Sequence, residues 1–88
     1  MNTIEFLEKC IKSDKLKEKI TALGRNDEIW YSIHNMIDEV EDDECDINFA
    51  AQEIDAVIWS FKDYESIDDL LENEFLSPEF YKLLKETA

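Results

Sequence analysis

The sequence contains little of what tight turns, catalytic sites and phosphate sites are made from. One glycine and one proline in 88 residues leave few places for tight turns, so a sheet-rich fold is disfavoured. His34 is the only histidine, and the chain has no glycine-rich phosphate loop, no G-x-S-x-G motif and no H-E-x-x-H motif. We therefore expect no catalytic residues, no enzyme activity and no cofactor.

Cysteine is also scarce. Cys10 and Cys45 stand far apart, without C-x-x-C spacing. A pairing of either thiol with His34 has no local motif to support it, and we expect both cysteines to be small, half-buried and reduced. No apolar run has the length of a signal peptide or a membrane span, which predicts a cytoplasmic protein without a membrane partner.

A run of carboxylates from Asp38 to Asp46 invites comparison with calcium-binding loops. An EF-hand loop needs alternating acidic ligands, a glycine at its sharp turn and a distant bidentate glutamate. This run has no glycine and its acidic residues are adjacent rather than alternating. We expect solvated charge in a connection between helices, and no metal site.

What the chain does contain is apolar residues at helical spacing, with no stretch that alternates as a strand does. The expected stripes are Ile4, Leu7, Cys10 and Ile11; Leu16, Ile20 and Leu23; Ile29, Trp30, Ile33, Met36, Ile37 and Val40; Ile47, Ala50, Ala51, Ile54, Val57, Ile58 and Phe61; Ile67, Leu70 and Leu71; and Phe80, Tyr81, Leu83 and Leu84. The fourth stripe is the most regular, so its helix is expected to be the central core element. Five core residues are predicted: Ile33, Ile37, Ile54, Ile58 and Leu70.

Residues with capping side chains precede these stripes. They are Asn2 or Thr3, Ser13–Asp14, Asn26–Asp27, Asp46 or Asn48, Ser66, and Ser77 followed by Pro78. Gly24 is expected to end the second helix, although the first two segments could equally form one continuous helix. The sequence predicts an all-α fold: a compact bundle of four to six short helices in a single domain spanning residues 1–88.

Charge divides the chain into two unequal parts. Residues 1–25 carry six basic and four acidic residues, a net charge of +2, whereas residues 26–88 carry nineteen acidic residues and three lysines, a net charge of −16. Self-repulsion on this scale destabilises a folded protein, so we expect the field to serve binding. A basic protein is the expected partner, and nucleic acid is not, because its phosphates would be repelled.

Aromatic residues lie off the apolar stripes in the acidic part. Tyr31 falls opposite its helix's stripe, whereas Trp59 lies about 140° from the centre of its own. Large aromatics among carboxylates are typical of protein-binding hot spots, although Trp59 could equally be buried on the flank of a central helix, as could Phe49. The expected partner-binding residues are Tyr31, His34, Asn35, Asp38, Glu41, Asp42, Asp43, Asp55, Trp59 and Asp63. We centre this surface on the outer side of the third helix and the acidic connection after it.

In size, acidity and the placement of Tyr31 beside the Asp38–Asp46 run, the chain resembles the immunity proteins of nuclease bacteriocins and contact-dependent inhibition systems. The resemblance implies a nuclease toxin as partner and no catalytic residues. Two alternatives stay open: a nucleic-acid mimic of the phage anti-restriction or anti-CRISPR type, and a small structural or adaptor subunit whose acidity keeps it in solution. A monomer is expected in each case.

Overall fold

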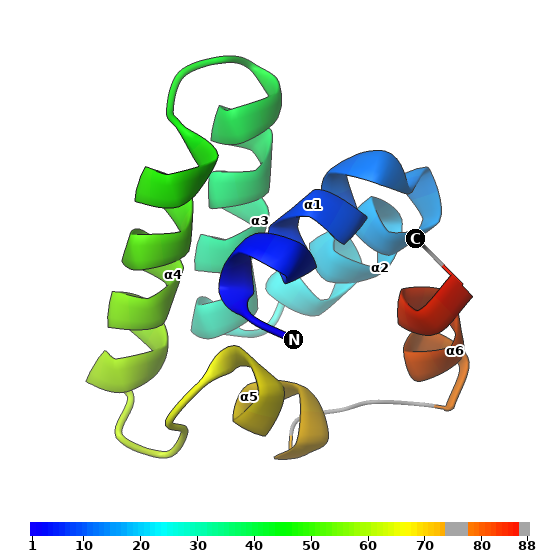
Figure 1. Ribbon diagram of the computed structural model, residues 1–88. Coiled ribbons are helices and arrows are strands. Elements are labelled where there is room, and N and C mark those ends of the chain that lie inside the picture. The colour runs from blue at the N-terminus through cyan, green and yellow to red at the C-terminus, as the bar shows by residue number, and fades with distance from the viewer. Residues whose placement is uncertain (74–77, 87–88) are drawn as a thin grey trace.

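A computed structural model describes residues 1–73 and 78–86 of the chain. Within these ranges the protein forms α-helices and no strand (Figure 1). The helices are α1 (Thr3–Lys12), α2 (Asp14–Gly24), α3 (Glu28–Glu41), α4 (Ile47–Ser60), α5 (Ile67–Asn73) and α6 (Pro78–Glu86). The predicted all-α bundle is confirmed.

Side-chain caps set where the helices begin. Asn2 accepts a hydrogen bond from the Glu5 amide at 2.8 Å, and Asp27 accepts one from the Ile29 amide at 2.9 Å. Asp46 caps α4 by accepting from the Asn48 amide, and Ser66 accepts from the Asp69 amide at the start of α5. Each bond satisfies an amide that a helix start would otherwise leave without a partner. The expected cap Ser77 lies outside the described residues.

Ser13 decides between one and two helices at the N-terminus. Its backbone is extended, with φ −126° and ψ 113°, so the helix is interrupted there. Its amide donates to the carbonyl of Cys10, and its hydroxyl accepts from the amide of Leu16 at 3.3 Å. One residue therefore ends α1 and starts α2, and the first two segments are separate helices.

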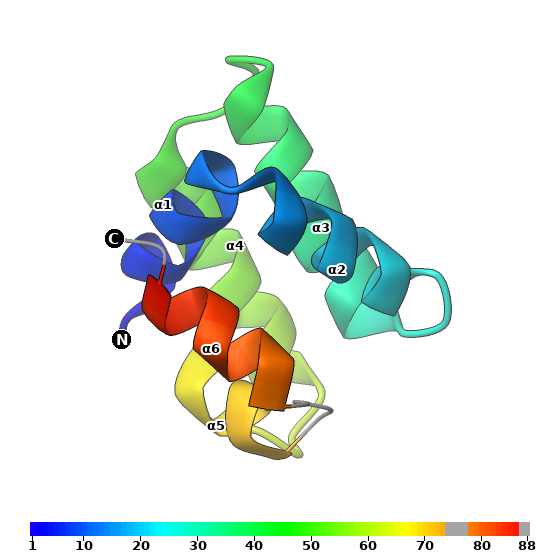
Figure 2. The ribbon, with the colours of Figure 1, turned by 90° about the vertical axis from the view of Figure 1, so that its right-hand side faces the viewer.

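Helices α3 and α4 form an antiparallel pair, with the other helices packed on one side and at one end of it (Figure 1). Helix α2 packs along α3, and α1 contacts α2, α3 and α4. Helix α5 packs against α4, and α6 packs against α2. Both C-terminal helices lie away from the turn that joins α3 to α4 (Figure 2). The α3–α4 hairpin is thus covered on one side only.

Trp30 of α3 lies at the centre of the core. Its side chain is fully buried, with ring centroids of Phe6 and Phe80 each 6.4 Å away. Helix α4 also contributes to this core through Ala50, Ala51, Ile54 and Ile58, and Phe6, absent from the expected α1 stripe, is fully buried. The indole nitrogen of Trp30 has no hydrogen-bond partner among the described residues. Burial of aromatic surface from α1, α3 and α6 outweighs that missing bond.

The five predicted core residues are all buried, as are Phe80 and Leu84 of α6. The margins of the expected stripes are only partly covered: Ile4, Ile11, Leu23, Met36, Val40, Ile47, Phe61 and Leu83 pack against the core from its edge. No helix in the described ranges combines the length and the apolar character needed to cross a membrane.

Gly24 does not end α2 in the expected way. A glycine cap adopts a positive φ, but Gly24 does not, and it is the last residue of the helix itself. A Cβ atom there would meet the carbonyl oxygen of Trp30 and the backbone of Tyr31 at 3.2 Å. Gly24 therefore permits close packing of α2 on α3. The left-handed turns instead fall on Asp43 (φ 58°) and Lys62 (φ 62°), just after α3 and α4.

Candidate protein-binding surface

The large apolar side chains that the fold leaves exposed are mostly aromatic. Among the described residues they are Trp59, Tyr31 and Phe49, with 69%, 57% and 52% of their surface exposed, and Met1 at the N-terminus. All three aromatics belong to the α3–α4 hairpin. Between Asp27 and Glu65, this region contains thirteen acidic residues and one lysine. The hairpin therefore combines exposed aromatic surface with a strong negative charge.

The outer side of α3 carries four of the expected binding residues. Tyr31, Asn35, Asp38 and Asp42 follow one another at spacings of four, three and four residues, which places them on one side of the helix. Tyr31 lies in the first turn, whereas Asp42 caps the last. Eleven residues separate them, about 16 Å along the axis. Tyr31 and the acidic connection thus share a face of α3 but lie at opposite ends of it.

Two expected binding residues of α3 have partners within the protein. His34 contacts the hydroxyl of Thr21 through Nδ1 at 3.1 Å and the carboxylate of Asp38 through Nε2 at 3.3 Å. Glu41 pairs with Lys17 of α2 at 3.0 Å. This partner and Asp14 raise the pKa of Lys17, chiefly through hydrogen bonds to the ammonium group. His34 and Glu41 therefore join α2 to α3.

The acidic connection between α3 and α4 projects as a short turn. The backbone amide of Asp42 donates to the carbonyl of Asp38 at 2.9 Å, so the last turn of α3 is closed by main-chain bonds. Asp42 and Asp43 are both exposed. Their carboxylates oppose the negative end of the α3 dipole, and a nearby cation on a partner would relieve this repulsion.

On α4, the three expected residues have different surroundings. Asp55 accepts a hydrogen bond from the hydroxyl of Thr3, which ties α4 to α1. Trp59 lies beside a hollow bordered by Thr3, Asp55 and Ile67, and its indole is exposed rather than buried in the core. Asp63 follows the helix and is exposed. Trp59 and Asp63 are therefore available to a partner, whereas Asp55 already has one contact.

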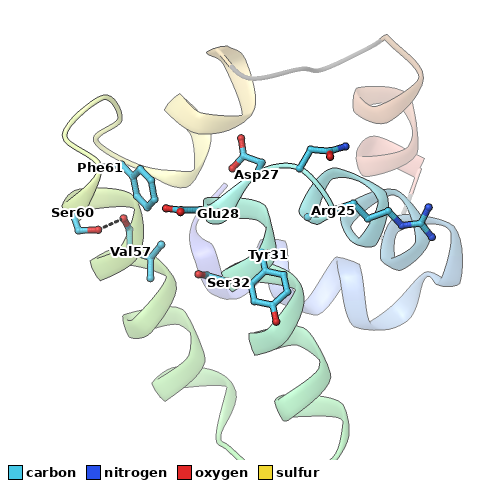
Figure 3. A pocket seen from close by; sticks show the side chains of 10 residues that line it. Arg25, Asp27, Glu28, Tyr31, Ser32, Val57, Ser60 and Phe61 are labelled. Atoms are coloured by element: carbon cyan, nitrogen blue, oxygen red, sulfur yellow. Dashed lines mark hydrogen bonds between the residues drawn. The ribbon is translucent and has the colours of Figure 1, made fainter.

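A groove of about 630 Å³ runs between the start of α3 and the end of α4 (Figure 3). Glu28, Tyr31 and Ser32 line one side of it, and Val57 and Phe61 line the other. In Figure 3, α1 lies on the far side of this helix pair, so the groove opens on the uncovered side of the hairpin. The sequence did not indicate that Tyr31 would line the same groove as Val57 and Phe61, because the groove depends on the antiparallel pairing of the two helices.

The expected site omitted Phe49, although its exposed aromatic ring fits the same pattern. Its position off the α4 stripe was the available signal. Gln52 and Ala56 lie at i+3 and i+7 from it, and both are also exposed. With Trp59 at i+10, these residues form a second line along α4, away from the core.

The two thiols have unlike environments. Cys10 is buried, and burial raises its pKa to about 12. Cys45 is half-buried; partial burial and then the carboxylates of Glu39, Asp46 and Glu44 raise its pKa as well. A raised pKa leaves little nucleophilic thiolate at neutral pH. Neither thiol, nor any cluster of three or more His, Cys, Asp and Glu residues in the described ranges, forms a metal-binding group.

Comparison of the chain with models of protein families, with curated proteins and with solved structures found no match.

Proposed function

We propose that this chain is an acidic binding protein that neutralises a basic protein partner, and that the partner is a nuclease toxin to which it confers immunity. One observation carries the proposal: Tyr31, Phe49 and Trp59 are exposed on one helical hairpin, and residues 27–65, which contain this hairpin, carry a net charge of −12.

Exposed aromatic residues and clustered carboxylates have complementary roles in such an interface. Burying an aromatic side chain removes about 150–250 Å² of surface from water, and aromatics often act as interface anchors. Carboxylates around an anchor accelerate the encounter with a positive partner and reject negative ones. Nuclease toxins need cationic surfaces to hold nucleic acid, which makes them suitable partners.

The exposed aromatics also favour this proposal over a nucleic-acid mimic. A mimic needs carboxylates spaced like phosphates along a surface, and three exposed aromatic rings would interrupt such a surface. The two functions differ in salt dependence and in breadth: a mimic binds several nucleic-acid enzymes, with affinity that falls steeply with salt. An immunity protein binds one toxin and retains an apolar contribution at high salt.

The test starts from the gene. We would express the chain together with the toxin domain encoded beside it, and measure survival of the host and inhibition of the purified domain. Rescue of growth with a stable complex supports the proposal. Inhibition of several unrelated DNA-binding enzymes would instead identify a mimic, and absence of any complex with a basic protein would overturn both.

Two sets of variants then locate the binding surface. Tyr31→Ala should mainly raise the dissociation rate, because it removes an anchor, whereas Asp42→Asn with Asp43→Asn should mainly slow association and weaken its dependence on salt. The matched charge control is Glu8→Gln with Glu18→Gln, which removes two exposed carboxylates from α1 and α2. Equal rates for the control pair and the Asp42–Asp43 pair would exclude the acidic connection from the interface.

A further inference from the structure

Helix α4 has a second line of residues that the fold does not cover. Phe49, Gln52, Ala56 and Trp59 are spaced by three, four and three residues and are all exposed. This spacing keeps them on one side of the helix, and it is the spacing by which helices pack against other helices. The opposite side of α4, with Ala50, Ala51, Ile54 and Ile58, is buried in the core. Helix α4 therefore has apolar residues on two opposite sides, but only one of these sides is buried in the core.

The exposed line, called the α4 saddle below, has an aromatic residue at each end. Phe49 and Trp59 are ten residues apart, about 15 Å along the axis, and a helix with its side chains is about 10–12 Å wide. Between the two aromatic residues lie the uncharged side chain of Gln52 and the methyl group of Ala56. A helix crossing over Gln52 and Ala56 would have an aromatic ring on each side, whereas a single extended strand would be narrower than the gap.

Hollows beside Trp59 give its ring room to adapt. One, of about 620 Å³, is bordered by Thr3, Asp55 and Ile67, and another, of about 410 Å³, by Lys62 and Tyr64. The exposed indole of Trp59 therefore borders two open spaces that a partner could fill.

The negative charge around the saddle indicates which charge a partner helix would need. Helix α4 contains Glu53 and Asp55 and no basic residue. From Asp46 to Glu65 there are five acidic residues and one lysine, a net charge of −4. A helix with lysine or arginine beside its apolar residues would complement this surface. A second copy of the chain would not, because each copy carries a net charge of −14.

We propose that the α4 saddle, formed by Phe49, Gln52, Ala56 and Trp59, receives a basic amphipathic helix of the partner protein. The inference rests on the proposed function for the positive sign of the partner's charge. It adds the secondary structure of the element that binds and a further place of contact, on α4, besides the outer side of α3.

The test uses a synthetic peptide of about 18 residues, long enough to form a helix, with leucines at helical spacing and lysines beside them. A peptide of the same composition in permuted order, without an apolar stripe, is the control. Titration calorimetry measures affinity for the full chain, and Trp59 fluorescence is followed in a Trp30→Phe background, where it is the remaining tryptophan. We expect the amphipathic peptide to bind at least about tenfold more tightly and to shift Trp59 emission to the blue.

Filling the saddle gives the sharpest contrast. Ala56→Trp should weaken peptide binding at least about tenfold, since it occupies the space between Phe49 and Trp59. Ala22→Trp, which adds the same side chain at an exposed position of α2, should leave binding unchanged. Circular dichroism of both variants checks that the helices remain folded.

Three results would overturn the inference: equal binding of the two peptides, unchanged peptide binding by Ala56→Trp, or self-association of the wild-type chain through α4 in sedimentation. If the toxin complex is weakened by Tyr31→Ala but unaffected by Ala56→Trp, the saddle fails while the proposed function stands. If the peptide binds the saddle but no basic protein is neutralised, the function fails.

Discussion

The first two helices and the α3–α4 hairpin differ in how many aromatic residues they expose and in how they use their charges. In α1 and α2 the one aromatic residue, Phe6, is fully buried. Lysines there bind within the molecule: Lys9 donates to the carbonyl of Leu84 at 2.9 Å, and Lys17 pairs with Asp14 and Glu41. In the hairpin, three aromatic residues are exposed among acidic residues.

The buried pattern serves stability, whereas the proposed function assigns the exposed pattern to binding. Side chains of α1 and α2 close the core and hold α3 and α6 in place. The hairpin contributes Trp30 and the isoleucines to that core, but its outer side leaves costly aromatic surface in water. Burying this aromatic surface against a partner would make a favourable contribution to the free energy of binding. The following predictions test whether the two uses can be separated.

The largest effect is expected from a charge placed in the core. Ile54→Asp should abolish folding, because an unpaired buried carboxylate costs several kcal/mol against a total stability on the order of 5–15 kcal/mol. The matched control is Gln52→Asp, which adds the same charge to an exposed position of α4. Circular dichroism should show loss of helix in the first variant alone. An Ile54→Asp protein that remained helical would contradict the placement of Ile54 in the core.

Alkaline pH should destabilise the protein through Cys10. Its folded-state pKa is about 12, against an ordinary value of 9.0, so the unfolded chain loses this proton first. The stabilisation is complete below pH 9 and is lost as pH rises toward 12, with an upper limit of about 4 kcal/mol from the shift. Urea unfolding from pH 8 to 11 measures it. Cys10→Ala should flatten the dependence more than Cys45→Ala, and equal slopes would contradict this account.

A smaller loss is expected where α2 meets α3. Gly24→Ala adds a methyl group 3.2 Å from backbone atoms of Trp30 and Tyr31, which cannot rotate away. We expect a loss on the order of 1 kcal/mol despite the better helix propensity of alanine. Ala22→Ser, at an exposed position nearby, provides the control in thermal unfolding. A rise in the melting temperature of Gly24→Ala would mean that the helices can separate at no cost.

The smallest stability effect is expected at Trp59. Its ring is 69% exposed, so Trp59→Ala should change the free energy of unfolding by no more than about 0.5 kcal/mol. Trp30→Ala, the same substitution in the core, should cost about 3–5 kcal/mol. Chemical denaturation of the two variants compares them directly. Similar losses would show that Trp59 supports the fold and is not reserved for a partner.

Local features of the fold were predictable from the sequence. Asp27, Asp46 and Ser13 cap the helices beside them, and the α3 and α4 stripes are buried as their periodicity indicates. Caps and stripes depend on neighbours a few residues away, so a short window of sequence contains the information.

Contacts between distant helices were not predictable. Trp30 is central because α1 and α6 bring Phe6 and Phe80 against it, and no short window contains all three. Within the candidate site, the pairing of Glu41 with Lys17 was equally hidden, since it depends on the packing of α2 along α3. The exposure of Trp59 was undecided for the same reason: helical spacing defines a flank, but not whether another helix covers it.

The position of the single glycine has a consequence for how this sequence can vary over evolutionary time. Substitution at residue 24 is restricted by a neighbouring backbone, so lineages descended from this protein should retain glycine there. At Asp43 and Lys62, where a positive φ is tolerated at a cost, glycine would be an improvement in conformational energy of about 1 kcal/mol. Persistence of an acidic residue at position 43 in descendants would indicate selection for its charge, against the preference of the backbone.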